Sequence, residues 1–436
     1  MSASRKSQLF WTVIVRFFAK SANLIALAIL ARALSVSDLG LYGFLFIASA
    51  MISMAFDAGT RNSVAFYMGR DPERRADFAR YALLAFVPFG ILSAIATPAV
   101  FLFHPSAPPM HVILAPVIVN TLSLLFIRME QGILLGSGQI SVFNRTEAVP
   151  RTVLLALTVG MFTIHEINLL TALYILAVAN LSGAIAVAFG VLPTIRGGQL
   201  LSLGDTKRLL KRGIVFMLGV MAMFATQKIS FLVIARVGSS SEMGLFYGAQ
   251  RLTEVMTEIA VAVSVVLFSN NVRADSKERA IRELSELTRI CIALFMLMGI
   301  AAYWLAPLLL RITLGEQYAG HAGLFRILLI GTFLGTIWTL SFTTLSVIEH
   351  PIVALLLILP NMIAGCILTL VLYNSMGLSG AAWAMVATMG GLSVSLLVAF
   401  KVRHGVRIRS FLVLSANDIE YIRTFRFLHR NNSTRN

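Results

Sequence analysis

Charged side chains that interrupt long apolar segments are the residues of this sequence best suited to chemistry. A charge at the centre of a lipid bilayer costs about 2.5–3.5 kcal/mol on insertion scales, so such a residue normally faces a cavity or a charged partner. Lys228 is the strongest candidate, because a lysine in the middle of an apolar segment has little room to extend to the headgroups. The other candidates are the cations Lys20, Arg61 and Arg251 and the acids Asp57, Glu254 and Glu258.

These residues support two kinds of chemistry. Lysine and arginine bind anionic groups such as phosphates, for which the guanidinium offers a planar fork of donors. A carboxyl group inside a membrane can bind and release a proton when its access to water changes. A structural interpretation stays open as well. Asp57 and Arg61 are four residues apart and Arg251 and Glu254 are three apart, so each couple can form a self-neutralising pair on one helix.

The composition indicates which elements carry these residues. Hydrophobic residues make up 58% of the chain and charged residues 13%, whereas a soluble domain is about 45–50% apolar and about 25% charged. The chain is therefore predicted to be an all-α polytopic membrane protein. A crossing helix needs about 20 mainly apolar residues. On that rule we predict twelve transmembrane helices, at residues 9–33, 41–67, 79–103, 111–135, 148–165, 168–192, 213–237, 244–270, 288–311, 323–347, 352–373 and 378–400.

The distribution of lysine and arginine predicts the orientation, because basic residues concentrate on the cytoplasmic side of membrane proteins. They gather between the second and third spans, between the sixth and seventh, after the eighth and in the tail, while the turns on the opposite side carry almost none. Both termini are therefore predicted to lie inside (N-in/C-in). This topology also accounts for the net charge of +16, so we expect no nucleic-acid partner.

Signals for an enzyme or a metal site are missing from the sequence. It contains no P-loop lysine motif, no GxGxxG, no HExxH and no GxSxG. Cys291 and Cys366 both lie in apolar runs, and the seven histidines lack metal-ligand spacing. We therefore expect no catalytic residue, no cofactor and no metal.

A fourteen-residue stretch returns after nearly half the chain. Residues 29–42, ILARALSVSDLGLY, are repeated as residues 233–246, VIARVGSSSEMGLF. The copies are six predicted spans apart and so run the same way through the membrane, which predicts parallel repeats related by an axis along the membrane normal. The predicted organisation is an N-terminal lobe over 1–195, a basic cytoplasmic linker over 196–212, a C-terminal lobe over 213–400 and a basic tail over 401–436. The tail is compatible with an amphipathic helix on the inner leaflet and equally with a solvated or frayed end.

Four stretches resemble the polysaccharide-lipid flippases (Wzx-type) of the multidrug/oligosaccharidyl-lipid/polysaccharide exporter superfamily. They are FDAGTRNSVAFYMGR from residue 56, GILLGSGQISVFNRTEAV from residue 132, LGEQYAGHAGLFRILLIGTFLGT from residue 314 and MGLSGAAWAMVATMGG from residue 376. In the first stretch Asp57, Gly59 and Arg61 match the acid–Gly–basic pattern of that family. The eighth predicted span has no clear counterpart of this pattern.

The resemblance implies a transporter that moves an undecaprenyl-pyrophosphate-linked oligosaccharide across the bacterial cytoplasmic membrane by alternating access, driven by a proton or sodium gradient. Its implied partners are the lipid-linked oligosaccharide, membrane lipids and other polysaccharide-assembly proteins. In this interpretation the substrate-binding residues of a cationic cavity are Lys20, Arg61, Lys228 and Arg251, and the ion-coupling residues are Asp57, Glu254 and Glu258. Two alternatives stay open: a multidrug or organic-ion exporter of the same superfamily, and a membrane assembly protein that transports nothing.

Overall fold

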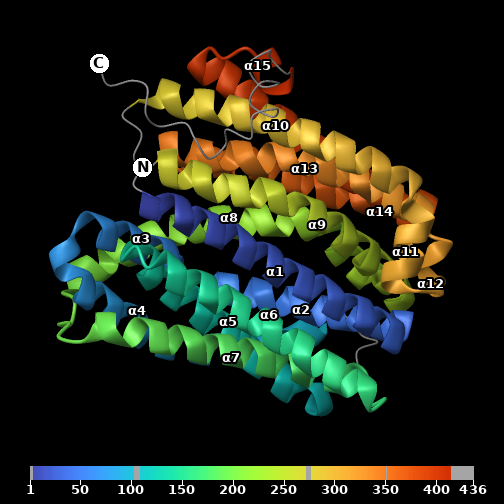
Figure 1. Ribbon diagram of the computed structural model, residues 1–436, viewed down its shortest axis with the longest axis horizontal. Helices are drawn as coiled ribbons and strands as arrows, with labels where there is room; N and C mark the ends of the chain where they lie inside the picture. Colours follow the sequence, from blue (N-terminus) through green and yellow to red (C-terminus); the bar gives the residue numbers. More distant parts are fainter. Residues whose placement is uncertain (1–2, 103–108, 272–275, 350, 414–436) are drawn as a thin grey trace. The chain divides into compact units, whose positions relative to one another are not determined.

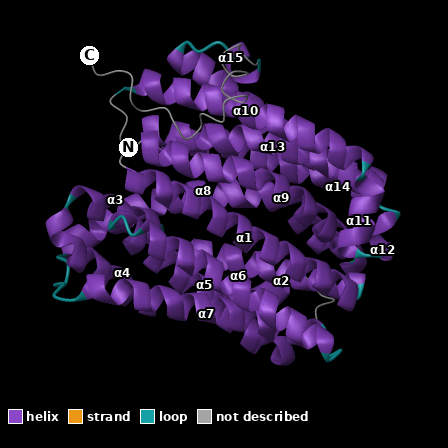
Figure 2. Cartoon of the chain, in the orientation of Figure 1, coloured by secondary structure: helices purple, strands orange, loops and turns teal. Residues whose placement is uncertain are grey.

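The computed structural model describes residues 3–102, 109–271, 276–349 and 351–413. Within those ranges every regular element is a helix (Figures 1 and 2). The longer helices are α1 (Ala3–Ala33), α2 (Val36–Phe56), α3 (Thr60–Arg70), α4 (Arg75–Ala96), α5 (Met110–Gly136), α6 (Ile140–Thr163), α7 (Leu169–Ile195), α8 (Leu203–Val237), α9 (Ser240–Asn271), α10 (Lys277–Trp304), α13 (Ala322–Ile348) and α14 (Pro351–His404). The short ones are η1 (Pro72–Arg74), η2 (Thr97–Leu102), α11 (Ala306–Leu314), α12 (Glu316–Ala319) and α15 (Arg409–Leu412). The predicted all-α class is confirmed.

Eight of the described helices are long and apolar enough to cross a membrane. One of them, α14, contains both of the last two predicted spans. They meet at Gly377, where the backbone leaves the helical conformation with φ of 59° and ψ of −141°. Every other predicted span also falls on described helices. A multi-pass membrane protein is thereby confirmed, whereas the number of twelve crossings and the orientation of the termini stay predictions. The amphipathic helix considered for the tail falls on residues 414–436, outside the described ranges.

The second predicted span, 41–67, is wrong as a single helix. α2 ends at Phe56 and α3 begins at Thr60, and the backbone between them turns through Ala58 and Gly59, with φ of 49° and 69°. Close packing accounts for the break, because a Cβ atom on Gly59 would lie 1.8 Å from the carbonyl oxygen of Gly213 in α8. Glycine alone allows both the left-handed backbone and this approach.

α8 begins earlier than its predicted span, at Leu203 instead of residue 213. The Ser202 side chain caps it: Oγ accepts a hydrogen bond from the Asp205 N–H at 3.1 Å and donates to Asp205 Oδ2 at 3.0 Å. Serine in this position satisfies an N–H group that has no partner within the helix. Most of the predicted linker 196–212 is therefore helical.

The chain divides into two compact units, one of residues 11–248 and 311–318 and the other of residues 1–10, 249–310 and 319–436. In the first unit α5 packs against α3, α4 and α7, and Figure 1 shows α4, α5 and α7 side by side. In the second unit α13 packs against α10 and α14. The predicted lobes, 1–195 and 213–400, are instead defined as two symmetry-related repeats. That symmetry stays a prediction.

Both copies of the repeated stretch build the same helix start. Ser35 Oγ accepts a hydrogen bond from the Asp38 N–H at 3.1 Å, and Ser239 Oγ accepts one from the Glu242 N–H at 3.2 Å. Both copies keep a serine and, three residues later, an acid, which is the pattern of a capping box. The repeat thus encodes the start of α2 and the start of α9.

The two copies also contact each other reciprocally. A Cβ atom on Gly40 would lie 2.3 Å from the carbonyl oxygen of Ser240, and one on Gly244 would lie 1.8 Å from the carbonyl oxygen of Val36. In the aligned repeats Ser240 corresponds to Val36, and Gly244 corresponds to Gly40. Exchanging the two copies therefore turns one contact into the other, as a two-fold axis would do. This reciprocity favours the predicted duplication.

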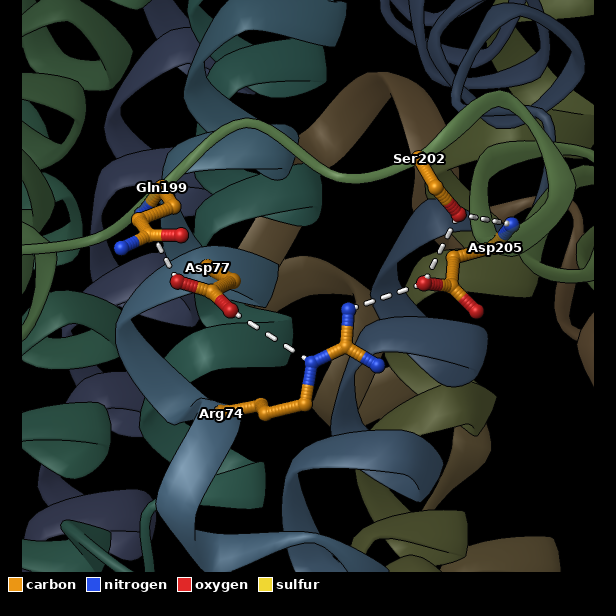
Figure 3. A network of polar contacts seen from close by, with 5 residues as sticks. All are labelled: Arg74, Asp77, Gln199, Ser202 and Asp205. Atoms are coloured by element: carbon orange, nitrogen blue, oxygen red, sulfur yellow. Dashed lines mark hydrogen bonds and ion pairs between the residues drawn. The ribbon is translucent and has the colours of Figure 1, made fainter.

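A polar network ties the loop between α7 and α8 to the start of α4 (Figure 3). Arg74 lies between two acids: its Nη2 donates to Asp205 Oδ2 at 2.8 Å, and its Nε lies 3.5 Å from Asp77 Oδ2. The other carboxylate oxygen of Asp77 accepts a hydrogen bond from the Gln199 N–H at 2.7 Å. The loop is thereby held both at a backbone amide and through the cap of α8.

We expect Asp77→Ala to raise the hydrogen-exchange rate of the Gln199 amide about five-fold, since a net hydrogen bond is worth about 1 kcal/mol. Exchange mass spectrometry of a peptide covering residues 196–202 measures the effect. The matched control is Glu73→Ala, which removes a neighbouring exposed acid outside this network. An unchanged rate in Asp77→Ala would mean that other contacts hold the loop.

Candidate functional site

Asp57 is buried at the C-terminal end of α2, and its described partner lies on another helix. Its Oδ2 atom is 3.4 Å from Nε of Arg128 in α5, and the two side chains are 4% and 17% exposed. The spacing in the sequence favours a pair with Arg61, one turn further along the chain. The guanidinium of Arg61 lies over the ring of Phe143 in α6, 5.9 Å from the centroid. An acid that neutralises one arginine thus lies beside a second arginine bordered by an aromatic ring.

Further along α3, two more arginines gather around one aromatic ring. The guanidinium carbon of Arg212 in α8 lies 3.5 Å from the centroid of Phe66, and that of Arg70 lies 4.3 Å from it. Both charges are attracted to the electron-rich ring face, while they repel each other. The arrangement therefore suits an anion with more than one negative charge. In the sequence, Arg70 and Arg212 belong to the basic clusters that predict the orientation of the chain. The signal for their contact was Phe66, which precedes Arg70 by four residues and so shares one face of a helix with it.

Lys228 lies inside α8 and is 4% exposed. It follows Gly213, where α8 contacts the α2–α3 break, by 15 residues. At 1.5 Å per residue, this puts Lys228 about 22 Å further along the helix. The structure therefore separates Lys228 from the arginines of α3. Lys20, the fourth predicted cation, is exposed on α1.

The predicted residues of α9 belong to the other compact unit. Arg251 Nη1 and Glu254 Oε2 form an ion pair at 3.0 Å, as their spacing allows. Both side chains are partly exposed, at 19% and 27%. The side chain of Glu258 lies outside those that the structure describes.

Glu130 of α5 is a candidate that sequence reasoning missed. Its side chain is fully buried, and neither carboxyl oxygen has a hydrogen-bond partner within the described part of the chain. One turn before and after it, Ile127, Ile133 and Leu134 belong to an apolar cluster that includes residues of α4 and α7, and Phe126 packs against that cluster. A carboxyl group buried in such surroundings without a hydrogen-bond partner is costly. The sequence signal was an acid only two residues from an arginine, inside an apolar span.

We expect Glu130→Met to raise the thermal midpoint of the purified protein. The substitution removes a polar group whose burial without a partner costs about 1–3 kcal/mol, and methionine fills a similar volume. Glu254→Met is the control, because it breaks the ion pair with Arg251 and should not stabilise the protein. A fall in the midpoint for Glu130→Met, measured by a thermal-shift assay, would show that the carboxyl group makes a stabilising interaction.

Comparisons with known proteins were consistent in family and in fold. The family described as "Polysaccharide biosynthesis protein" matches residues 6–268, more than half of the chain. An inward-facing multidrug resistance MATE family transporter of the MOP superfamily is similar in structure, with a TM-score of 0.70 and 17% identity over 91% of this chain and 98% of that one. The lipid II flippase MurJ, in an inward closed conformation, gives a TM-score of 0.71 and 14% identity over 97% and 94% of the two chains.

A MOP superfamily transporter from Pyrococcus furiosus gives a TM-score of 0.65 and 16% identity over 93% and 96% of the chains. No curated protein matches the sequence. At 14–17% identity, the similarity to these solved structures establishes only the fold. The evolutionary relationship rests on the family match over residues 6–268. Among the described residues, no group of three or more histidine, cysteine, aspartate or glutamate side chains could hold a metal ion.

Proposed function

Since this chain belongs to the polysaccharide biosynthesis protein family, as its four resembling stretches predicted, we propose that it is a flippase for lipid-linked oligosaccharides. In this proposal the substrate is an undecaprenyl-pyrophosphate-linked oligosaccharide. The protein moves it from the inner to the outer leaflet of the bacterial cytoplasmic membrane for the assembly of an O-antigen, a capsule or an exopolysaccharide. One observation carries the proposal: the family match extends over residues 6–268 of a chain that shares its fold, over 97% of its length, with a lipid II flippase.

The basic residues support an anionic headgroup as the cargo. Arg61, Lys20, Lys228 and Arg251 remain the proposed substrate-binding residues, and the arginines around Phe66 are added to them. Guanidinium groups bind phosphate oxygens with two parallel hydrogen bonds. The lipid tail stays in the bilayer while these groups bind the pyrophosphate and the glycan crosses in water. A cationic path would disfavour the organic cations that a multidrug exporter accepts.

Asp57, Glu254 and Glu258 remain the proposed ion-coupling residues, with protons or sodium as the ion. The contact between Asp57 and Arg128 suggests how coupling would act: protonation of Asp57 would remove the negative charge that holds Arg128. The arginine would then become available to a substrate anion. The protonation state of Asp57 would thus set how strongly this site binds the anion.

The decisive experiment is deletion of the gene, followed by measurement of where lipid-linked oligosaccharide accumulates. We expect accumulation on the cytoplasmic side and loss of the surface glycan, both reversed by the wild-type gene. Normal glycan assembly together with increased sensitivity to organic cations would favour an exporter instead. If a variant without the proposed substrate-binding charges transports nothing but still restores the surface glycan, the result would favour an assembly protein.

A further inference from the structure

A narrow apolar groove lies between α10 and α13, within one compact unit. Its volume is about 190 Å³. It is lined only by apolar and aromatic residues and glycine: Phe295, Met296, Gly299, Ile300, Tyr303, Trp304, Leu329, Ile330 and Phe333. Several of these side chains are open to the surroundings of the helices, among them Ile300 at 55% and Trp304 at 74% exposed. In a membrane, lipid chains are the neighbours of such a surface.

The groove has the length of one leaflet. It extends along α10 from Phe295 to Trp304, which at 1.5 Å per residue is about 14 Å. Half of the hydrocarbon core of a bilayer is about 15 Å. Tyr303 and Trp304 close the groove at the C-terminal end of α10, and these two residue types prefer the boundary between hydrocarbon and headgroups. The groove therefore matches a single acyl chain that hangs from the headgroup region toward the bilayer centre.

A positive charge stands at the boundary end of the groove. Arg326, near the start of α13, donates from Nε to the carbonyl oxygen of Tyr303 at 3.0 Å, and its guanidinium carbon lies 5.0 Å from the Tyr303 ring centroid. These two contacts fix the plane of the guanidinium. The terminal nitrogens Nη1 and Nη2 form no hydrogen bond or ion pair with the described residues, so a fixed fork of donors stays available. Such a fork binds a phosphate with little further loss of side-chain freedom.

We propose that this groove is a binding site for an anionic phospholipid, with one acyl chain between α10 and α13 and the headgroup phosphate on Arg326. The proposal does not depend on the transported substrate. A polyprenyl chain is many times longer than the groove, whereas one phospholipid chain fills it. The bound lipid would hold the end of α10 against the start of α13.

The test is native mass spectrometry of the purified full-length chain with phosphatidylglycerol and phosphatidylcholine of identical acyl chains. We expect the wild type to bind phosphatidylglycerol about five-fold more tightly, as one arginine near a headgroup provides. Arg326→Ala should remove this preference, so that the variant binds the two lipids about equally tightly. Gly299→Leu should weaken the binding of both lipids, because Gly299 lines the groove and the leucine side chain would extend into it. Leucine also favours the helix more than glycine does, so this variant is expected to fold even if Arg326→Ala does not.

The matched control is Arg311→Ala, an exposed arginine on the next helix along the chain, which pairs with Glu316 at 2.6 Å. It should bind both lipids as the wild type does. Equal binding of the two lipids by the wild type, or an unchanged preference in Arg326→Ala, overturns the proposal. Displacement of phosphatidylglycerol by an equimolar amount of undecaprenyl phosphate also overturns it, in favour of a site for the transported lipid.

Discussion

Replacing Lys228 by methionine is expected to reduce flipping about 100-fold while the chain stays folded in the membrane. Lys228 is 4% exposed within α8, a helix that otherwise meets the requirements of a membrane span. In the proposed function its ammonium group binds the anionic substrate during transfer. Loss of a charged partner in a water-poor site costs about 3 kcal/mol, and each 1.4 kcal/mol is a factor of ten. Methionine retains the length and the apolar stem of lysine, so packing changes little.

Transfer of a fluorescent lipid-linked oligosaccharide across the bilayer of proteoliposomes measures this effect. Lys228→Arg is the paired variant, and it should retain part of the activity because the positive charge stays. The amount of protein in the membrane and its thermal midpoint separate a functional role from a structural one. If Lys228→Met flips the substrate normally, Lys228 is not a substrate-binding residue. If the Lys228→Met protein fails to accumulate in the membrane, Lys228 is required for folding.

The second large effect is expected at the reciprocal glycine contact. Gly244→Ala would bring a methyl group within 1.8 Å of the Val36 carbonyl oxygen, so the starts of α2 and α9 must move apart. Gly40→Ala meets the Ser240 carbonyl oxygen at 2.3 Å. Overpacking of this kind costs about 1–3 kcal/mol or more. We expect both variants to lower the thermal midpoint and the yield of folded protein.

Gly219→Ala is the matched control for these variants. Gly219 is also buried in a helix, yet a Cβ atom added there would have no heavy atom within 4 Å outside its own turn of the helix. Alanine favours a helix over glycine by about 1 kcal/mol, so this variant should be as stable as the wild type or more stable. Wild-type stability of Gly244→Ala would show that the two helix starts do not touch in the membrane.

Much of the fold follows from local properties of the sequence. Apolar runs of the length of a bilayer predict the helices. They place the starts of the second and eighth spans at residues 41 and 244, whereas α2 begins at Val36 and α9 at Ser240, because the capping serines before them extend each helix beyond its apolar run. The break at Gly59 does not follow in the same way. The local sequence permits a turn there, but the close contact with Gly213, far along the chain, requires it.

The site is less predictable than the fold for a related reason. A sequence shows which charges share one helix, and it favours Arg61 as the partner of Asp57. The described partner, Arg128, depends on the packing of α2 against α5. Glu130 was recognisable as an acid in an apolar span, but only the packed structure shows that its side chain is fully buried and its carboxyl oxygens lack a hydrogen-bond partner among the described residues.

The ion pair between Asp57 and Arg128 also affects how the chain enters the membrane. Insertion of an arginine in the centre of a span costs about 2.5–3.5 kcal/mol when no partner is present. Because synthesis proceeds from the N-terminus, α2 is already in the membrane when the ribosome makes α5. Asp57 can therefore neutralise Arg128 as α5 leaves the translocon, which would lower the cost of inserting α5. A circular permutation that moved α5 ahead of α2 would deliver the arginine to lipid before its acid had been made.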